Sequence, residues 1–120
     1  MINIEILKKD GLYFSLESSG HADYDDRGYD IVCAGVSALT QTLYFYLLDL
    51  GLDQANIEDK QDEGYLLIKL KKNYRNEKVQ AAFEYMLKGL ELLKSQYIEY
   101  IKIDIMEVRN DNIWFTTFFF

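Results

Sequence analysis

Two hydrophobic periodicities alternate along this chain, and their order restricts the fold more than any other feature of the sequence. Apolar residues recur at every second position in four segments, which predicts strands with one apolar face: residues 2–6, 12–16, 65–70 and 101–105. They recur at steps of three and four in residues 32–50 and 79–97, which predicts two amphipathic helices. A weaker pattern in residues 56–62, before a Glu63-Gly64 turn, is interpreted as one more strand.

The predicted order is therefore β-β-α-β-β-α-β. Strands with one apolar face and two amphipathic helices bury their apolar surfaces together when both helices cover the same face of a sheet. We expect a two-layer α+β domain, mostly antiparallel, over residues 1–108. The other face of the sheet would stay in water or meet a second subunit, and it is expected to carry Tyr13, Lys69, Lys102 and Asp104.

Three residues indicate where the first helix begins and ends and where the second helix packs closely. Asp30 is a good N-cap for the first helix, and Gly51 is a plausible C′ residue after its end. Gly89 lies inside the second helix, where glycine costs roughly 1 kcal/mol relative to alanine. A close packing contact is the simplest reason for it.

Residues 109–120 form an aromatic tail outside this pattern. Its sequence, RNDNIWFTTFFF, carries no charge after Asp111. The sequence leaves three interpretations open, namely an extra strand, a dimer contact and a disordered end.

Net charge and cysteine content limit the partners and the compartment. The formal net charge is −7, which disfavours non-specific binding to nucleic acid, because such binding depends on Lys and Arg neutralising phosphates. The single cysteine excludes an intrachain disulfide. The first residues lack the layout of a secretory signal, and no apolar run approaches a membrane span. We expect a cytoplasmic protein that contacts neither membrane nor nucleic acid directly.

Histidine and cysteine each occur once, and both lie where a long aspartate-rich loop meets the first helix. Cys33 is expected in the first turn of that helix, where free N–H groups and the positive end of the dipole stabilise a thiolate. His21 is close enough in sequence to take the thiol proton and later donate it to a leaving amine. This pairing is typical of a cysteine peptidase.

Simpler interpretations exist for each of these residues. A single cysteine near a helix start is usually a small buried residue, and a loop histidine is usually just exposed. Asp30 either orients the imidazole or caps the helix, and Ser37 either hydrogen-bonds near the thiol or fills the helix. A metal site is disfavoured, because structural zinc takes four ligands and this region offers only His21, Cys33 and aspartates.

The amino-acid sequence where the loop meets the first helix favours the catalytic interpretation. Residues 20–39 read GHADYDDRGYDIVCAGVSAL. This stretch resembles the signature of the ribosomal-processing cysteine protease family, in which Gly-His-Ala is followed after a loop by Asp-Ile-Val-Cys-Ala, a small residue, Val-Ser and Ala-Leu. The resemblance extends over residues 1–108.

The resemblance implies a bacterial endopeptidase that removes the N-terminal extension of large-subunit ribosomal protein twenty-seven. By match to the motif, His21 and Cys33 would be the catalytic dyad, and Asp30 and Ser37 would support the active site. Gly20 would be the flexible point of the loop. Members are typically homodimers without metal or cofactor.

The same resemblance implies a substrate that is apolar before its cut and basic after it. The acidic loop residues would then bind the basic part of the substrate. With the two alanines that follow the dyad residues, they make up the expected substrate-binding set: Ala22, Asp23, Asp25, Asp26 and Ala34. The main alternative is a module that binds a ribosomal protein without cutting it, and a third is a structural dimer with a buried cysteine.

Overall fold

Six strands and two helices make up the part of the chain that this computed structural model describes, residues 1–20, 27–109 and 113–119. In chain order they are β1 (Ile2–Lys9), β2 (Leu12–Ser19), α1 (Arg27–Asp49), β3 (Ile57–Asp62), β4 (Tyr65–Leu70), α2 (Glu77–Gln96), β5 (Ile101–Arg109) and β6 (Ile113–Phe119). The strands form one sheet in the order β3-β4-β2-β1-β5-β6.

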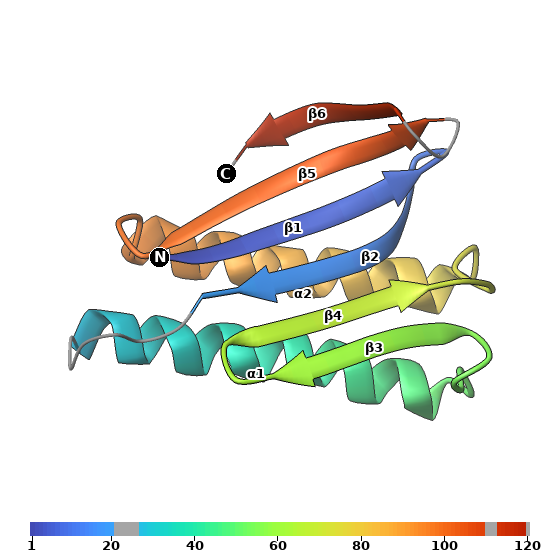
Figure 1. Ribbon diagram of the computed structural model, residues 1–120, viewed down its shortest axis with the longest axis horizontal. Coiled ribbons are helices and arrows are strands. Elements are labelled where there is room, and N and C mark those ends of the chain that lie inside the picture. Colours follow the sequence, from blue (N-terminus) through green and yellow to red (C-terminus); the bar gives the residue numbers. More distant parts are fainter. Residues whose placement is uncertain (21–26, 110–112, 120) are drawn as a thin grey trace.

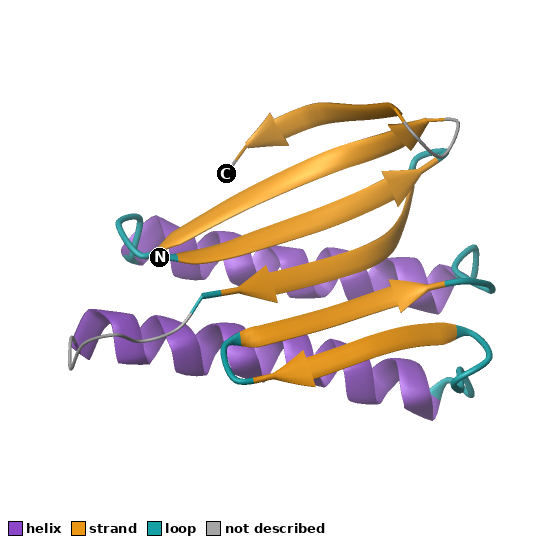
Figure 2. Cartoon of the chain, viewed as in Figure 1, coloured by secondary structure: helices purple, strands orange, loops and turns teal. Residues whose placement is uncertain are grey.

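The sheet is mostly antiparallel, as the sequence predicts. Among the described strands only β1 and β5 are parallel neighbours. Figures 1 and 2 show both helices on the same face of the sheet. The two-layer α+β architecture and the order β-β-α-β-β-α-β are therefore confirmed for the elements before β6.

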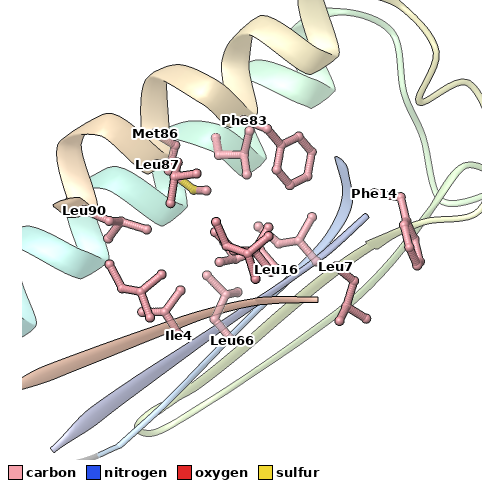
Figure 3. Close-up of a cluster of buried hydrophobic side chains, with 14 of the residues drawn as sticks. Ile4, Leu7, Phe14, Leu16, Leu66, Phe83, Met86, Leu87 and Leu90 are labelled. Carbon is pink, nitrogen blue, oxygen red and sulfur yellow. The ribbon is translucent and has the colours of Figure 1, made fainter. Parts of the chain in front are cut away.

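The hydrophobic core lies between the sheet and the two helices. Figure 3 shows Phe83, Leu87 and Leu90 of α2 directed at Ile4 and Leu16 in the strands. All five side chains are buried. Burying one such side chain stabilises the fold by about 1.5–3 kcal/mol, so alternation in the strands and helical periodicity in α2 converge on one core.

The two helices approach each other at glycines. A Cβ atom built on Gly89 of α2 would lie 2.6 Å from Cδ2 of Leu39 in α1, and one on Gly35 of α1 would lie 2.9 Å from Cδ2 of Leu93 in α2. Each helix thus presents a glycine to a leucine of the other. The packing explanation for Gly89 is confirmed.

The start of α1 differs from the prediction. The helix begins at Arg27, so Asp30 lies within its first turn and is not the N-cap. The error arose because the loop pattern continues through Gly28, a poor helix former that hides the first turn.

The end of α1 has the glycine cap that the sequence predicts, and the start of α2 is capped by an asparagine side chain. Gly51 has φ +93°, and its N–H donates to Leu48 O at 2.9 Å while Leu52 N–H donates to Leu47 O at 3.2 Å. These two bonds form a Schellman motif with Gly51 at C′. At the start of α2, Oδ1 of Asn76 accepts a hydrogen bond from Lys78 N–H at 2.7 Å.

A β-bulge changes the face on which Tyr13 lies. Lys8 pairs with Tyr13 and Leu7 pairs with Ser15, so Phe14 has no partner in β1. The extra residue reverses the alternation. Tyr13 therefore stacks on Phe83 of α2, with ring centroids 5.8 Å apart. The prediction that Tyr13 lies on the sheet face away from the helices was wrong.

Of the three interpretations of the C-terminal tail, the structure has the extra strand. β6 pairs antiparallel with β5 and forms one edge of the sheet. Figure 1 shows β6 at the opposite edge from β3.

By length and composition alone, Asp30–Asp49 of α1 is apolar enough to cross a membrane, contrary to the expectation from sequence. The core helix of a soluble domain meets the same criterion. Val32, Val36, Leu43 and Leu47 are buried in the core, whereas Ile31, Phe45, Tyr46 and Leu48 of the same helix are exposed.

Candidate active site

Cys33 lies in the second turn of α1, because the helix begins at Arg27. Its side chain is half-buried against the core. The expectation that it lies in the first turn was wrong. Free N–H groups and most of the dipole effect are confined to the first turn of a helix, so in this conformation the helix end does not supply them to the thiol.

A cavity of about 330 Å³ opens beside Cys33. It lies between α1, the turn that joins β3 to β4, and the adjoining ends of β1 and β2. One wall comes from a single face of α1, with Cys33, Val36, Ser37, Thr40 and Gln41. The opposite wall comes from the β3–β4 turn and the start of β4, with Asp62, Glu63, Gly64, Tyr65 and Leu66. Ile2, Ser18 and Gly20 complete the lining. A cavity of this volume fits a short part of a peptide.

Gly20 is held on two sides in the cavity wall. Its N–H donates a hydrogen bond to Gly64 O at 2.9 Å. It has φ +139°, and a Cβ there would lie 2.6 Å from Met1 O. Glycine is therefore required at this position by both conformation and space.

The structure brings together only some of the predicted site residues. Ser37 lines the cavity one turn after Cys33 and is exposed. Asp30 and Ala34 are exposed and are absent from the cavity lining. The remaining predicted residues lie outside the described part of the chain, namely His21, Ala22, Asp23, Asp25 and Asp26.

Sequence reasoning missed two groups of cavity residues. Thr40 is buried, and its hydroxyl donates to Val36 O at 2.8 Å. Helical spacing from Cys33 could have identified Thr40 and Gln41, because residues seven and eight positions apart share a face. The β3–β4 turn carries no such signal, since only the tertiary fold brings it to Cys33.

Three carboxylates form a row on the sheet face away from the helices. Glu5 in β1 is flanked by Glu17 in β2 and Asp104 in β5 at paired positions. Burial, followed by these two like charges, raises the pKa of Glu5.

Tyr65 connects this row to the cavity wall. Its hydroxyl donates to Glu17 Oε2 at 2.5 Å. This bond is the main reason that the pKa of Tyr65 is raised to about 12, with burial a smaller cause. Among the described residues, no group of three His, Cys, Asp or Glu side chains is placed to hold a metal ion.

Comparison with known proteins gives a consistent match. The family model for cysteine protease Prp matches residues 1–102. The ribosomal processing cysteine protease Prp of Staphylococcus aureus is 29% identical over 105 residues, which cover 87% of this chain and 98% of that protein. β6 lies beyond the residues that the family model matches.

Solved structures of Prp from S. aureus have the same fold. One, in complex with a substrate peptide, superposes with a TM-score of 0.77 at 27% identity and covers 88% of this chain and 99% of its own. Another, with a covalently linked product peptide, superposes with a TM-score of 0.73 at 29% identity and the same coverage.

Proposed function

Because the chain belongs to the Prp family of cysteine proteases, we propose that it removes the N-terminal extension of large-subunit ribosomal protein twenty-seven. The relative from S. aureus is named a ribosomal processing protease, and its structures include a substrate peptide and a covalently linked product peptide. The observation that carries the proposal is the cavity beside Cys33 within the matched residues.

Cys33 acts as the nucleophile and His21 as its base. His21 takes the thiol proton, and the sulfur then attacks the scissile carbonyl carbon and forms a C–S bond. Protonated His21 gives its proton to the amine as the C–N bond breaks. Water then hydrolyses the thioester, releasing a carboxylic acid and restoring the thiol. Since Cys33 lies away from the free N–H groups of α1, the base carries the activation.

The roles that we propose for the supporting residues are based on their positions. Ser37 shares the cavity with Cys33 and donates a hydrogen bond to substrate there. Asp30 lies in the first turn of α1, where a carboxylate is stabilised by the dipole, and it orients His21. Gly20, whose N–H is bonded to Gly64 O, is the flexible point of the loop that carries His21. Asp23, Asp25 and Asp26 bind the basic part of the substrate, and Ala22 and Ala34, each next to a dyad residue in the chain, contact the substrate as well.

We also propose that the enzyme works in the cytoplasm as a homodimer, without metal or cofactor. A ribosomal protein precursor is made in the cytoplasm, which supports the compartment. Large apolar side chains on the helices are exposed in the single chain, among them Phe45 at 57% and Tyr85 at 83%. An apolar groove of about 530 Å³ between α1 and α2 supports the dimer as well.

The proposed function is tested with ribosomal protein twenty-seven that carries its extension. After incubation, intact mass should fall by the mass of the extension with the parental protein and stay unchanged with Cys33→Ala. Ser95→Ala is a matched control, because Ser95 is exposed on α2, its hydroxyl donates to Leu92 O of its own helix, and it lines neither the cavity nor the apolar groove. It should cleave like the parent.

Two results would count against the proposal. Cleavage by Cys33→Ser at the parental rate would exclude the thiol mechanism. A stable complex without any loss of mass would indicate a binding module for the ribosomal protein.

A further inference from the structure

We propose that Gly64, in the turn between β3 and β4, is a positioning residue whose carbonyl fixes the main chain immediately before His21. This inference rests on the proposed function, since it takes His21 as the base. The residue that Gly64 holds is Gly20, and both line the cavity beside Cys33.

The bond between the two glycines extends the sheet by one step. The ladder between β2 and β4 ends at the pair Ser19 and Tyr65. One position further along, Gly20 N–H donates to Gly64 O at 2.9 Å. The turn therefore controls the direction in which the chain leaves β2 toward His21.

The opposite side of Gly20 is closed by the start of β1. A Cβ on Gly20 would lie 2.6 Å from Met1 O and 3.0 Å from Ile2 Cα. Gly20 is thus confined between the β3–β4 turn and the first residues of the chain. A shift of the turn is transmitted to Gly20 through the hydrogen bond from Gly20 N–H to Gly64 O.

The conformation of this turn differs from that of the other hairpin turn. Asp10 and Gly11 join β1 to β2 with φ +54° and +77°, as a type I′ turn requires. Gly64 has φ +69°, but among the described non-glycine residues only Asp10 and Asn73 have positive φ, so Glu63 does not. The β3–β4 turn is therefore not type I′, the type that matches strand twist best.

The functional consequence follows from proximity. The turn lines the cavity together with Cys33 and also holds the residue before His21, so a displaced turn would displace the point from which the chain continues to the base. A misplacement of about 1 Å in an active site can lower the rate about a hundredfold.

Gly64→Val tests the proposal, with Gly11→Val as the matched control. Both glycines are in two-residue hairpin turns at similar positive φ, a conformation that valine disfavours strongly. Nothing lies within 4 Å of a Cβ on Gly11, and Figure 1 shows the β1–β2 turn at the opposite end of the sheet from the β3–β4 turn. The strain that positive φ imposes on valine should be similar in the two variants.

The two readouts are kcat for cleavage of the extended ribosomal protein and the rate of Cys33 alkylation as a function of pH. Gly64→Val should lower kcat by about tenfold to a hundredfold. Its alkylation profile should approach that of His21→Ala. Gly11→Val should keep the parental kcat and the parental profile. Gly64→Asn should recover most of the lost kcat, because asparagine tolerates positive φ.

The outcomes separate this inference from the proposed function. A parental kcat and alkylation profile in Gly64→Val would overturn the positioning role and leave the proposed function intact. A parental protein whose alkylation is unaffected by His21→Ala would overturn the dyad, and the positioning role with it. If Gly64→Val does not fold, Gly64→Ala against Gly11→Ala decides in the same way, since alanine strains the turn less.

Discussion

Leu39 of α1 lies directly over Gly89 of α2, so closely that a Cβ on Gly89 would be 2.6 Å from Leu39 Cδ2. This contact sets how closely the helix that carries Cys33 approaches α2. It also means that Gly89, an unfavourable residue inside a helix, is retained by packing against α1.

Gly89→Ala is therefore expected to lower the free energy of unfolding. The gain in helix propensity is about 1 kcal/mol, whereas overpacking a filled contact costs about 1–3 kcal/mol. In a Leu39→Ala background the clash is absent, and the same substitution should stabilise the protein by about 1 kcal/mol. Denaturant unfolding of the four proteins in this double-mutant cycle gives the coupling. Equal effects of Gly89→Ala in both backgrounds would contradict the packing explanation.

Replacing Glu5 by Gln should make the protein more stable at pH 7. The pKa of Glu5 is raised in the folded state by burial and by the charges of Glu17 and Asp104. A raised carboxyl pKa favours folding while the group is protonated, and this contribution disappears as the pH rises through the folded-state pKa. The ionised group then lies opposite two like charges, and each like-charged pair destabilises the fold by about 0.5 kcal/mol.

Denaturant unfolding between about pH 4 and pH 7 measures this effect. The parental protein should lose stability relative to Glu5→Gln as the pH rises. Glu58→Gln is the control, because it removes the same charge from exposed β3, opposite Lys69. Lower stability of Glu5→Gln than of the parent at pH 7 would show that the row is not repulsive.

Tyr65→Phe should destabilise the protein by about 1 kcal/mol, which is less than the roughly 1.5–3 kcal/mol of a hydrogen bond to a charged group because this bond is only partly buried. The neutral hydroxyl donates to Glu17, and the pKa of Tyr65 is raised to about 12. Its contribution is present below the ordinary tyrosine pKa and is lost as the pH rises through about 12. The control is the same substitution in a Glu17→Ala background, where the bond is already absent and Tyr65→Phe should have little effect.

The acidic loop gives a prediction about ionic strength. Replacing Asp23, Asp25 and Asp26 together by Asn should weaken cleavage of a basic substrate peptide at low salt. The difference should shrink when salt screens the charges. The control removes three exposed charges elsewhere, at Asp49, Glu58 and Glu99. An unchanged rate at both salt concentrations, or the same loss in the control, would exclude the loop as the binding site for basic residues.

Periodicity was enough to predict both helices and the strands β1, β2, β4 and β5, because one apolar face is visible in sequence wherever an element packs on one side. β3 was inferred from the Glu63-Gly64 turn that follows it, since only Ile57 of this strand is buried. The side of the sheet on which Tyr13 lies was not predictable in this way. A bulge inserts a single residue without a mark in the composition, and every side chain beyond it changes face.

From the sequence, cavity residues could be predicted only where they lie near Cys33 along the chain. Cys33 and Ser37 lie on a cavity because helical spacing places them on one face, which sequence can show. The opposite wall, with Gly64, is brought there by the pairing of β4 with β2. Contacts between segments distant in sequence depend on register, which the pattern of Glu63-Gly64 alone does not encode.

Unwinding of the first turn of α1 would lengthen the segment between Gly20 and Cys33. A residue in a helix advances the chain by about 1.5 Å, whereas an extended residue advances it by about 3.3 Å. Gly28 lies in this turn, and glycine lowers helix stability there by about 1 kcal/mol relative to alanine. Unwinding up to Asp30 would lengthen the tether to His21 and bring the new helix terminus to the thiol, while the packed residues from Val32 onward stay in place.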